Sequence, residues 1–266
     1  MAARRTAVRF VLAAALPALA IAAGGCPVSP ADTPVVEFSR TTQNTRAGYW
    51  LYVPSTYKPD RLWPMLVTLH GTPGFDSAAA QAKEWRGLAE EHGFLVLAPS
   101  LKSTQGVLPV GRSSRLKSLE QDEARVLEAV AETQKQYRVD PAAVMISGFS
   151  AGGYPLYYIG LRNARLFSAI IARTANCDMK ILEKLPVTAK LQATPILIFF
   201  SKTGINPISS HLNPVANQSW AAYRYLRLAG CKAARIKSVR GGHQRHADQA
   251  FAFWRKHQPQ LRTPPP

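Results

Sequence analysis

Short apolar segments alternate with helical segments along most of this chain, and this alternation restricts its possible folds more than any other feature. Each apolar segment is bounded by turn residues, as expected for strands buried on both faces of a sheet. The expected strands are 65–69, 94–98, 143–147, 169–171, 196–200 and 235–239, and the expected helices are 78–91, 119–137, 154–161, 220–228 and 244–257. Strands that alternate with helices predict an α/β fold, with a mostly parallel central sheet and helices on both faces.

The chain has the size and composition of one globular domain between two short ends of different character. It contains 266 residues, of which 47% are hydrophobic, so a sizeable core is possible and a disordered or disulfide-scaffold protein is excluded. We expect an export signal at 1–25, a proline-rich tether at 26–34, a folded domain at 35–258 and a proline-rich tail at 259–266. Alternating residues at 35–38 and 49–53 indicate an antiparallel strand pair at the start of the domain.

The N-terminus has the pattern of an export signal. Arg4, Arg5 and Arg9 precede an apolar stretch over residues 10–23 that is too short to span a bilayer comfortably. The Ala-Gly-Gly-Cys segment that ends at Cys26 resembles a bacterial lipobox, although alanine stands where that pattern usually has leucine. This resemblance implies lipidation of Cys26 and anchoring to the bacterial cell envelope, whereas an ordinary secretory signal would release the chain. Both interpretations predict an exported protein.

Cys177 and Cys231 are then the cysteines that could pair in an oxidising compartment. Cys177 follows an expected strand and Cys231 precedes one, so in a parallel sheet they lie at opposite ends, about 15 Å apart. A disulfide needs Cα atoms within about 7 Å. We therefore expect two small apolar side chains without a bridge, and a Cys177–Cys231 disulfide is the alternative.

The segment from Ser147 to Gly153, Ser-Gly-Phe-Ser-Ala-Gly-Gly, contains the strongest motif in the chain. It follows an expected strand and precedes an expected helix, which is the setting of a nucleophile elbow. A serine in a tight strand-to-helix turn projects its hydroxyl above the sheet, and glycines flank it because side chains there would clash. This setting predicts that Ser150 is a catalytic nucleophile. The alternative is a glycine-rich turn with an incidental serine.

A second segment, residues 69–74 at the end of an earlier expected strand, contains His70 and Thr72. Attack of a serine on a carbonyl carbon builds negative charge on the carbonyl oxygen, and fixed backbone N–H groups stabilise that charge, by about 3 kcal/mol for one donor. We assign this oxyanion hole to the backbone amides of Thr72 and Ala151. His70 is expected to support the loop rather than to carry a proton.

A third segment, Gly241-Gly242-His243, follows the last expected strand. A general base for a serine must be neutral near pH 7 and able to pass the proton on, and imidazole suits this task. His243 fits by its position and by the chain order of nucleophile and base. His246 is the rival, but it falls inside the expected helix 244–257, where a solvated histidine is the ordinary interpretation.

With the strand pair, the His-Gly loop, the serine elbow and the Gly-Gly-His segment in place, the chain resembles the α/β-hydrolase superfamily. Within it, the chain is most similar to small exported esterases of the polyhydroxybutyrate depolymerase and feruloyl esterase type. The matching segments also include 49–54, 64–70, 93–99, Asp140-Pro141 and Gly230-Cys231. The resemblance implies an α/β-hydrolase fold and a serine carboxylesterase that acts on a small or polymeric ester, without a metal or an organic cofactor.

The chain departs from the superfamily pattern at the third member of the catalytic triad. That member is usually an Asp in a Gly-x-x-Asp-Pro-like turn after the penultimate strand, and the corresponding position here is Asn206. An amide can orient an imidazole but cannot stabilise an imidazolium by charge. Between nucleophile and base the only carboxylates are Asp178 and Glu183. Because some superfamily members place the acid after an earlier strand, we expect Asp178 to be the acid, with Asn206 as the alternative. If Asp178 has no catalytic role, we expect it to form an ion pair with Arg173 or Lys180.

Two other functions compete with an esterase. A serine peptidase of the prolyl-oligopeptidase kind shares the sheet and the triad, but a chain of this length has no room for the extra domain that usually restricts access there. A catalytically inactive, envelope-binding lipoprotein would explain Asn206, but not the retention of Ser150, His243 and the oxyanion loop.

The charge of the chain is strongly positive and uneven. The net charge is +17, and residues 151–266 hold 17 Lys and Arg against 3 Asp and Glu. Export and the lack of a recognition motif argue against nucleic acid as a partner. The charge instead predicts a positive field around His243, which would favour anionic esters or an acidic cell envelope.

Overall fold

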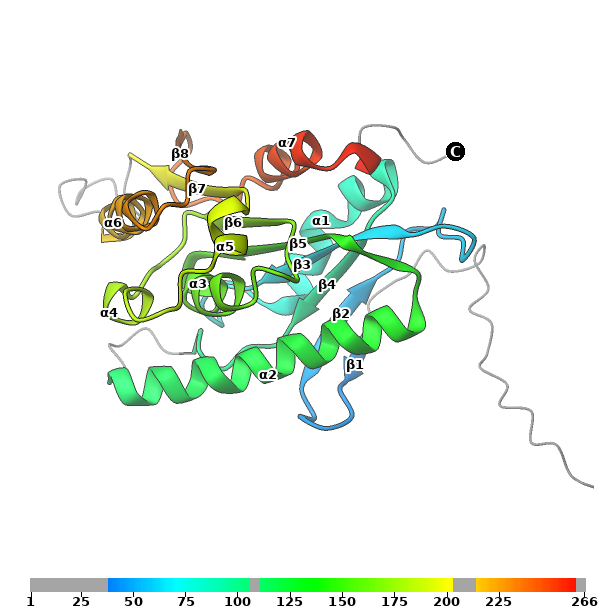
Figure 1. The fold of residues 1–266 in the computed structure, drawn as a ribbon. Helices are drawn as coiled ribbons and strands as arrows, with labels where there is room; N and C mark the ends of the chain where they lie inside the picture. Colours follow the sequence, from blue (N-terminus) through cyan, green and yellow to red (C-terminus); the bar gives the residue numbers. More distant parts are fainter. Residues whose placement is uncertain (1–37, 106–110, 203–213, 262–266) are drawn as a thin grey trace, which may run out of the picture.

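Parallel strands dominate the sheet, as the alternation of segments predicts (Figure 1). In this computed structural model, which describes residues 38–105, 111–202 and 214–261, the strands are β1 (Phe38–Thr41), β2 (Gly48–Tyr52), β3 (Trp63–Leu69), β4 (Leu95–Pro99), β5 (Val139–Phe149), β6 (Ala169–Arg173), β7 (Ile196–Ser201) and β8 (Ala234–Val239). They are ordered β1-β2-β4-β3-β5-β6-β7-β8. β1 and β4 pair with β2 antiparallel, and all the other pairs are parallel.

The apolar strands are buried because helices cover both faces of the sheet. Every residue of β3, β4 and β6 is buried, which explains why these strands are mostly continuous apolar runs, with Thr68 and Arg173 as buried polar residues near the ends of β3 and β6. One face is covered by α1 (Ala78–His92) and α7 (Ala247–His257), and the other by α2 (Arg112–Gln136), α3 (Gly153–Arg162) and α6 (Pro214–Leu228) (Figure 1). The short helices α4 (Met179–Leu182) and α5 (Ala189–Ala193) lie between β6 and β7 in the chain.

Each face has its own hydrophobic core. Trp85 of α1 and Trp254 of α7 belong to one core, and both side chains are fully buried. Val126 of α2, Leu156 of α3 and Leu226 of α6 belong to the other. The two cores hold the central strands rigidly between them, so the loops at the carboxyl ends of these strands start from a fixed frame.

Local signals set the ends of α1. The Ser77 side chain accepts a hydrogen bond from the Ala80 N–H (3.1 Å), which caps the first turn. Gly93 ends the helix with a φ of 71°, and its N–H donates to the Ala89 carbonyl. These caps explain why the observed helix agrees closely with the expected range 78–91.

Three other helices begin away from their expected starts, among them α6, which begins at Pro214 rather than at 220. α2 begins at Arg112 rather than at 119. The sequence pattern does not reveal this first part of the helix, because residues 112–118 contain one large apolar side chain, Leu116, which is exposed, so the segment has no amphipathic period. α7 begins at Ala247 rather than at 244, because His246 adopts a left-handed conformation with a φ of 51°.

Cys177 and Cys231 are both free and buried. The prediction of two unbridged cysteines is thus confirmed, and the alternative disulfide does not form. Burial raises the pKa of the Cys177 thiol well above its ordinary value, which makes it unreactive as a nucleophile.

The expected export signal at 1–25, Cys26 and the tether at 26–34 lie outside the described residues, as does the end of the expected tail. In the described ranges, none of the helices has the length and hydropathy that crossing a bilayer requires.

Gly87 offers a test of the assignment of α1. It is an exposed residue inside the helix, and a Cβ atom built on it would meet no atom within 4 Å. Gly87→Ala should therefore raise the free energy of unfolding by about 0.5–1 kcal/mol, because alanine loses less backbone entropy in a helix. Thermal unfolding should show a Tm about 1–4 °C higher. A lower Tm would contradict the packing described for this face.

Candidate active site

Ser150 lies in a strained turn directly after β5. Its φ is 52°, in the left-handed region that residues with side chains rarely adopt. The turn continues through a 3-10 segment, Ser150–Gly152, into α3, so the predicted strand-turn-helix arrangement is present. A side chain held in this way at the carboxyl end of a strand stands above the sheet. Ser150 therefore has the backbone geometry of a nucleophile elbow.

Glycines flank the elbow because backbone groups approach them too closely for a side chain. A Cβ atom on Gly148 would lie 2.5 Å from the Gly152 carbonyl oxygen. One on Gly152 would lie 2.4 Å from the Leu69 carbonyl oxygen. Such separations lie well inside van der Waals contact, and a dense interior cannot move apart to relieve them. The Gly-x-Ser-x-Gly pattern thus reflects close packing within the elbow at Gly148 and against the end of β3 at Gly152.

The loop after β3 lies directly beside the serine. A Cβ atom on Gly71 would lie 3.1 Å from the Cβ atom of Ser150. The Gly71 N–H donates to Asp76 Oδ2 (2.7 Å), so that amide already has its acceptor. Within the described ranges, the amides of Thr72 and Ala151, the two predicted oxyanion donors, have no hydrogen-bond partner. Neither of these N–H groups is thus committed to an acceptor in the described part of the chain.

His70 supports this loop, as predicted. Its Nδ1 donates to the Gly71 carbonyl (2.7 Å), and its Nε2 accepts from the Leu101 N–H (3.0 Å). Burial lowers its pKa, so the ring stays neutral at pH 7. Both ring nitrogens are occupied by the backbone, which leaves His70 no site for proton transfer.

His243 packs against the residue that precedes the serine. Gly241 and Gly242 before it have φ values of 87° and 77°, so the chain turns sharply after β8. The His243 ring centroid lies 4.9 Å from that of Phe149, and the side chain is half-buried. Burial lowers the pKa of His243, which keeps its imidazole neutral near pH 7. This is the protonation state that a general base requires.

The expected placement of His246 inside a helix is wrong. His246 is the N-cap residue of α7, it is half-buried, and its ring packs edge-on to Phe199 of β7 with centroids 6.3 Å apart. Its Nδ1 lies 3.4 Å from Gln249 Nε2, and its Nε2 is buried without a hydrogen bond among the described residues. The ring therefore faces the core under α7, whereas His243 contacts Phe149.

Asp178 is occupied by other partners. Its side chain caps α4 by accepting from the Lys180 N–H (3.1 Å), and its Oδ2 lies 3.9 Å from Arg115 Nε. Among the described residues, no hydrogen bond or ion pair joins Asp178 to His243. Asn206 lies outside the described residues. The identity of the third triad member therefore stays a prediction.

Arg173 and Arg245 form ion pairs next to this site that the sequence patterns did not reveal. Arg173 Nη1 donates to Glu84 Oε2 (2.9 Å), and Arg245 Nη2 donates to Asp76 Oδ1 (2.7 Å). One feature of the sequence could have indicated an ion pair here, namely the arginine, Arg173, that ends the apolar run of β6. A charged residue at the end of a strand that is buried on both faces usually has a partner of opposite charge. Both cations have a carboxylate neighbour, which weakens the positive field expected around His243.

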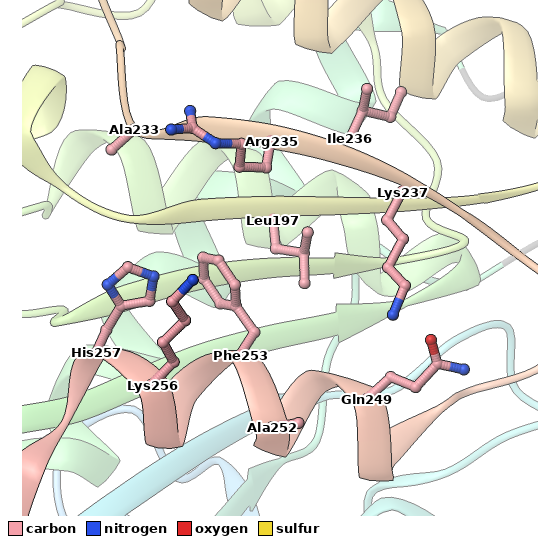
Figure 2. A pocket seen from close by; sticks show the side chains of 10 residues that line it. All are labelled: Leu197, Ala233, Arg235, Ile236, Lys237, Gln249, Ala252, Phe253, Lys256 and His257. Atoms are coloured by element: carbon pink, nitrogen blue, oxygen red, sulfur yellow. The ribbon is translucent and has the colours of Figure 1, made fainter.

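Part of the C-terminal positive charge gathers elsewhere. A groove between β8 and α7 has Leu197 and Phe253 in its lining, with Arg235, Lys237 and Lys256 around them (Figure 2). Neither the serine, the histidine nor the two oxyanion residues belong to its lining. The hollow is therefore separate from the elbow.

Comparisons with known proteins match part of the chain by sequence and most of it by fold. The profile of the prolyl oligopeptidase family matches residues 115–195, a segment that contains the elbow. A bifunctional acetylxylan esterase/xylanase of Neocallimastix patriciarum is 27% identical over 108 residues, which are 41% of this chain and 15% of that protein. The chain thus spans a small part of the curated relative that it matches.

Two solved structures show the same fold. A thermostable esterase superimposes with a TM-score of 0.61 at 19% identity, over 84% of this chain and 62% of the esterase. A ferulic acid esterase from Anaeromyces mucronatus does so with a TM-score of 0.59 at 13% identity, over 82% of this chain and 87% of that one. Together with the strand order and the strained serine turn, these superpositions show that the chain has the α/β-hydrolase fold.

Proposed function

We propose that the chain is a serine carboxylesterase with Ser150 as nucleophile and His243 as general base. The observation that carries the proposal is the φ of 52° at Ser150, at the carboxyl end of a central strand and beside a loop with an unused amide. Strain of about 1–3 kcal/mol at a single residue is usually kept where a function needs it. At Ser150 the strain coincides with a strand-to-helix turn between closely packed glycines, which is the setting of a nucleophile elbow.

The reaction follows from the groups around Ser150. The Oγ atom attacks the ester carbonyl carbon while His243 takes its proton, and the carbonyl electrons move to the oxygen held by the amides of Thr72 and Ala151. The intermediate then expels the alcohol, which receives the proton from His243, and leaves an acyl ester on Ser150. Water activated by the same histidine releases the acid and restores the serine.

The third member of the triad is proposed from two candidates. Both carboxylate oxygens of Asp178 already have partners, at the start of α4 and on Arg115. Asn206 follows β7, where the superfamily usually places its acid. We therefore put Asn206 first, as a neutral group that orients the imidazole, and Asp178 second. A neutral group leaves the imidazolium without a counter-charge, which predicts slow turnover.

An ester is preferred to a peptide as substrate. The curated relative is named an acetylxylan esterase/xylanase, and the two solved structures are named esterases. The prolyl oligopeptidase profile keeps peptide hydrolysis as the second candidate function. Parallel assays with a short-chain nitrophenyl ester and a peptide nitroanilide distinguish an esterase from a peptidase. A catalytically inactive lipoprotein would hydrolyse neither substrate.

We also propose that the protein is exported and anchored to the cell envelope through lipid on Cys26. The charged and apolar pattern of residues 1–25 supports export, and the small residues before Cys26 support lipidation. Labelling of cells with a clickable fatty acid, compared between the wild type and Cys26→Ser, tests the anchor.

Ser150→Ala should abolish covalent labelling by a fluorophosphonate probe, since the Oγ atom is the group that the probe modifies. The wild-type protein should label and should hydrolyse a short-chain nitrophenyl ester. Ser147, on β5 just before the elbow, is buried and supplies the control: Ser147→Ala should still label. A wild-type protein that does not label would exclude the proposed function.

Asn206→Asp should raise kcat at least tenfold if Asn206 occupies the position of the acid, because a carboxylate stabilises the imidazolium by its charge. In a related triad, replacing the Asp by Asn lowers kcat about 10⁴-fold. Asp178→Asn keeps an acceptor for the cap of α4 and should change kcat by less than about threefold. Steady-state kinetics on one ester substrate measure both. The reverse pattern, with a large loss in Asp178→Asn, would assign the acid to Asp178.

The lowered pKa of His243 predicts the pH dependence of kcat/KM. A general base works only when it is deprotonated. Because the pKa of His243 lies below the ordinary 6.5, kcat/KM should persist as the pH falls through 6.5, and its acidic limb should lie below pH 6.5. Phe149→Ala removes the ring that buries His243 and should move the limb back towards pH 6.5. A wild-type limb above pH 6.5 would argue against a buried neutral base.

A further inference from the structure

The carboxyl end of β6 contains a second strained residue, Thr174. Its φ is 43°, and the side chain is buried. A β-branched residue is seldom found in this left-handed region, because its Cβ substituents crowd the backbone. Such a conformation persists only where the surroundings hold it in place. The contacts of Thr174 and of its neighbour Arg173 supply these surroundings.

Both residues donate to the loop that carries His243. Thr174 Oγ1 donates to the Gln244 carbonyl (3.0 Å), and Arg173 Nη1 donates to the Arg245 carbonyl (3.4 Å). These are the carbonyls of the two residues that follow His243. The glycines before His243 provide little restraint, so these two hydrogen bonds tie down the loop from its other side.

The Arg173 guanidinium is itself held on several sides. It is fully buried, it pairs with Glu84 Oε2 (2.9 Å), and its Nη2 donates to Thr68 Oγ1 (3.1 Å) and to Gln81 Oε1. The central carbon of the guanidinium, Cζ, lies 5.0 Å from the centroid of the Trp85 ring. Because α1 and β3 supply these partners, the guanidinium cannot move independently of the sheet.

The same cluster reaches the loop beside Ser150. Arg245 donates to Asp76 Oδ1 (2.7 Å), while Asp76 Oδ2 accepts from the Gly71 N–H (2.7 Å) and from Gln81 Nε2 (2.8 Å). Gln81 in turn contacts Arg173. One connected set of hydrogen bonds therefore joins the histidine loop, the end of β6 and the loop after β3.

Stability alone is a weak explanation for this cluster. Burial of the charged groups of Arg173 and Asp76 costs desolvation energy, and apolar side chains of similar size often replace buried ion pairs without loss of stability. What apolar side chains cannot do is hold two loop carbonyls and one loop amide in a set geometry. A displacement of a catalytic group by about 1 Å is enough to cost about 100-fold in rate.

We propose that Arg173 and Thr174 are positioning residues that hold the His243 loop in register with Ser150 and the oxyanion loop. This inference rests on the proposed function, because it assigns His243 a proton to transfer. Arg173 and Thr174 act through the carbonyls of Gln244 and Arg245, and they need no contact with the substrate.

The test compares Thr174→Val with Thr174→Ser. Valine has the shape of threonine without the hydroxyl, and serine keeps the hydroxyl. We expect kcat to fall on the order of tenfold in Thr174→Val at an unchanged KM, and to stay within about threefold of the wild type in Thr174→Ser. Arg173→Lys keeps the charge but loses the planar fork that reaches several acceptors at once, so we expect a fall of about 10- to 100-fold.

Each kcat is normalised to the number of active sites, titrated with a fluorophosphonate to completion. A merely structural role reduces the number of titrated sites or the Tm, whereas a positioning role reduces kcat per titrated site. Thr133→Val is the matched control, because Thr133 is another buried threonine that donates to a carbonyl, that of Ala129 in α2 (2.8 Å), away from the three loops. Its kcat per site should be that of the wild type.

The outcomes separate the inference from the function on which it rests. A wild-type protein that labels, together with a Thr174→Val variant whose kcat per site is unchanged, would overturn the inference and leave the esterase proposal intact. An equal fall in Thr174→Val and Thr133→Val would also overturn it. If Arg173→Lys does not fold, the threonine pair still decides. A wild-type protein that does not label removes the proposed function, and the inference falls with it.

Discussion

The turn at Ser150 keeps a side chain at a φ of 52°, and the surrounding structure is arranged around the close contacts that hold this turn. Gly152 packs against the carbonyl of Leu69, so the start of α3 rests on the end of β3. The Ser150 carbonyl accepts from the Asn176 N–H (2.8 Å), which ties the turn to the segment after β6. Without these contacts the backbone would relax to an ordinary conformation, and the serine would lose its position above the sheet.

Polar groups gather where the parallel strands end, because the loops there leave the apolar layers. Inside the sheet, β3 and β6 bury apolar side chains on both faces, and the burial of that surface drives folding. At the carboxyl ends, Arg173, Gln81 and Asp76 replace apolar packing with hydrogen bonds of defined direction. Apolar contacts hold the frame together, whereas directional bonds determine how one loop faces another. Both kinds of interaction are needed for a serine and a histidine to meet from distant parts of the chain.

Net charge turns out to be a poor guide to the environment of the histidine. The C-terminal part of the chain has a large excess of cations, yet Arg245 pairs with a carboxylate from the loop after β3, and Arg173 pairs with one from α1. Lys237 and Arg235 line a groove on β8 instead. What lowers the pKa of His243 is burial of its ring rather than a neighbouring cation.

The order of strands and helices, the elbow and the supporting role of His70 could be predicted, because each depends on residues close together in the chain. Apolar periodicity, a glycine pattern and a turn are local signals, and the structure confirms them for β3 to β8 and for α1. The start of α7 could not be predicted, since the left-handed His246 packs on Phe199 of β7, and this contact joins residues far apart in the sequence. The partners of Asp178 were also hidden, because Arg115 lies in a turn of α2 without an amphipathic pattern.

The sequence by itself thus determined which segments become strands and helices, and which serine stands in a turn too tight for most residues. Only the tertiary structure decided which side chains meet across that frame: Arg173 with the carbonyl of Arg245, Thr174 with that of Gln244, and Arg245 with Asp76. The physical reason is the range of the forces. Backbone propensity and apolar periodicity act within a few residues, whereas a hydrogen bond between residues 169 positions apart exists only after the sheet has brought its strand ends together.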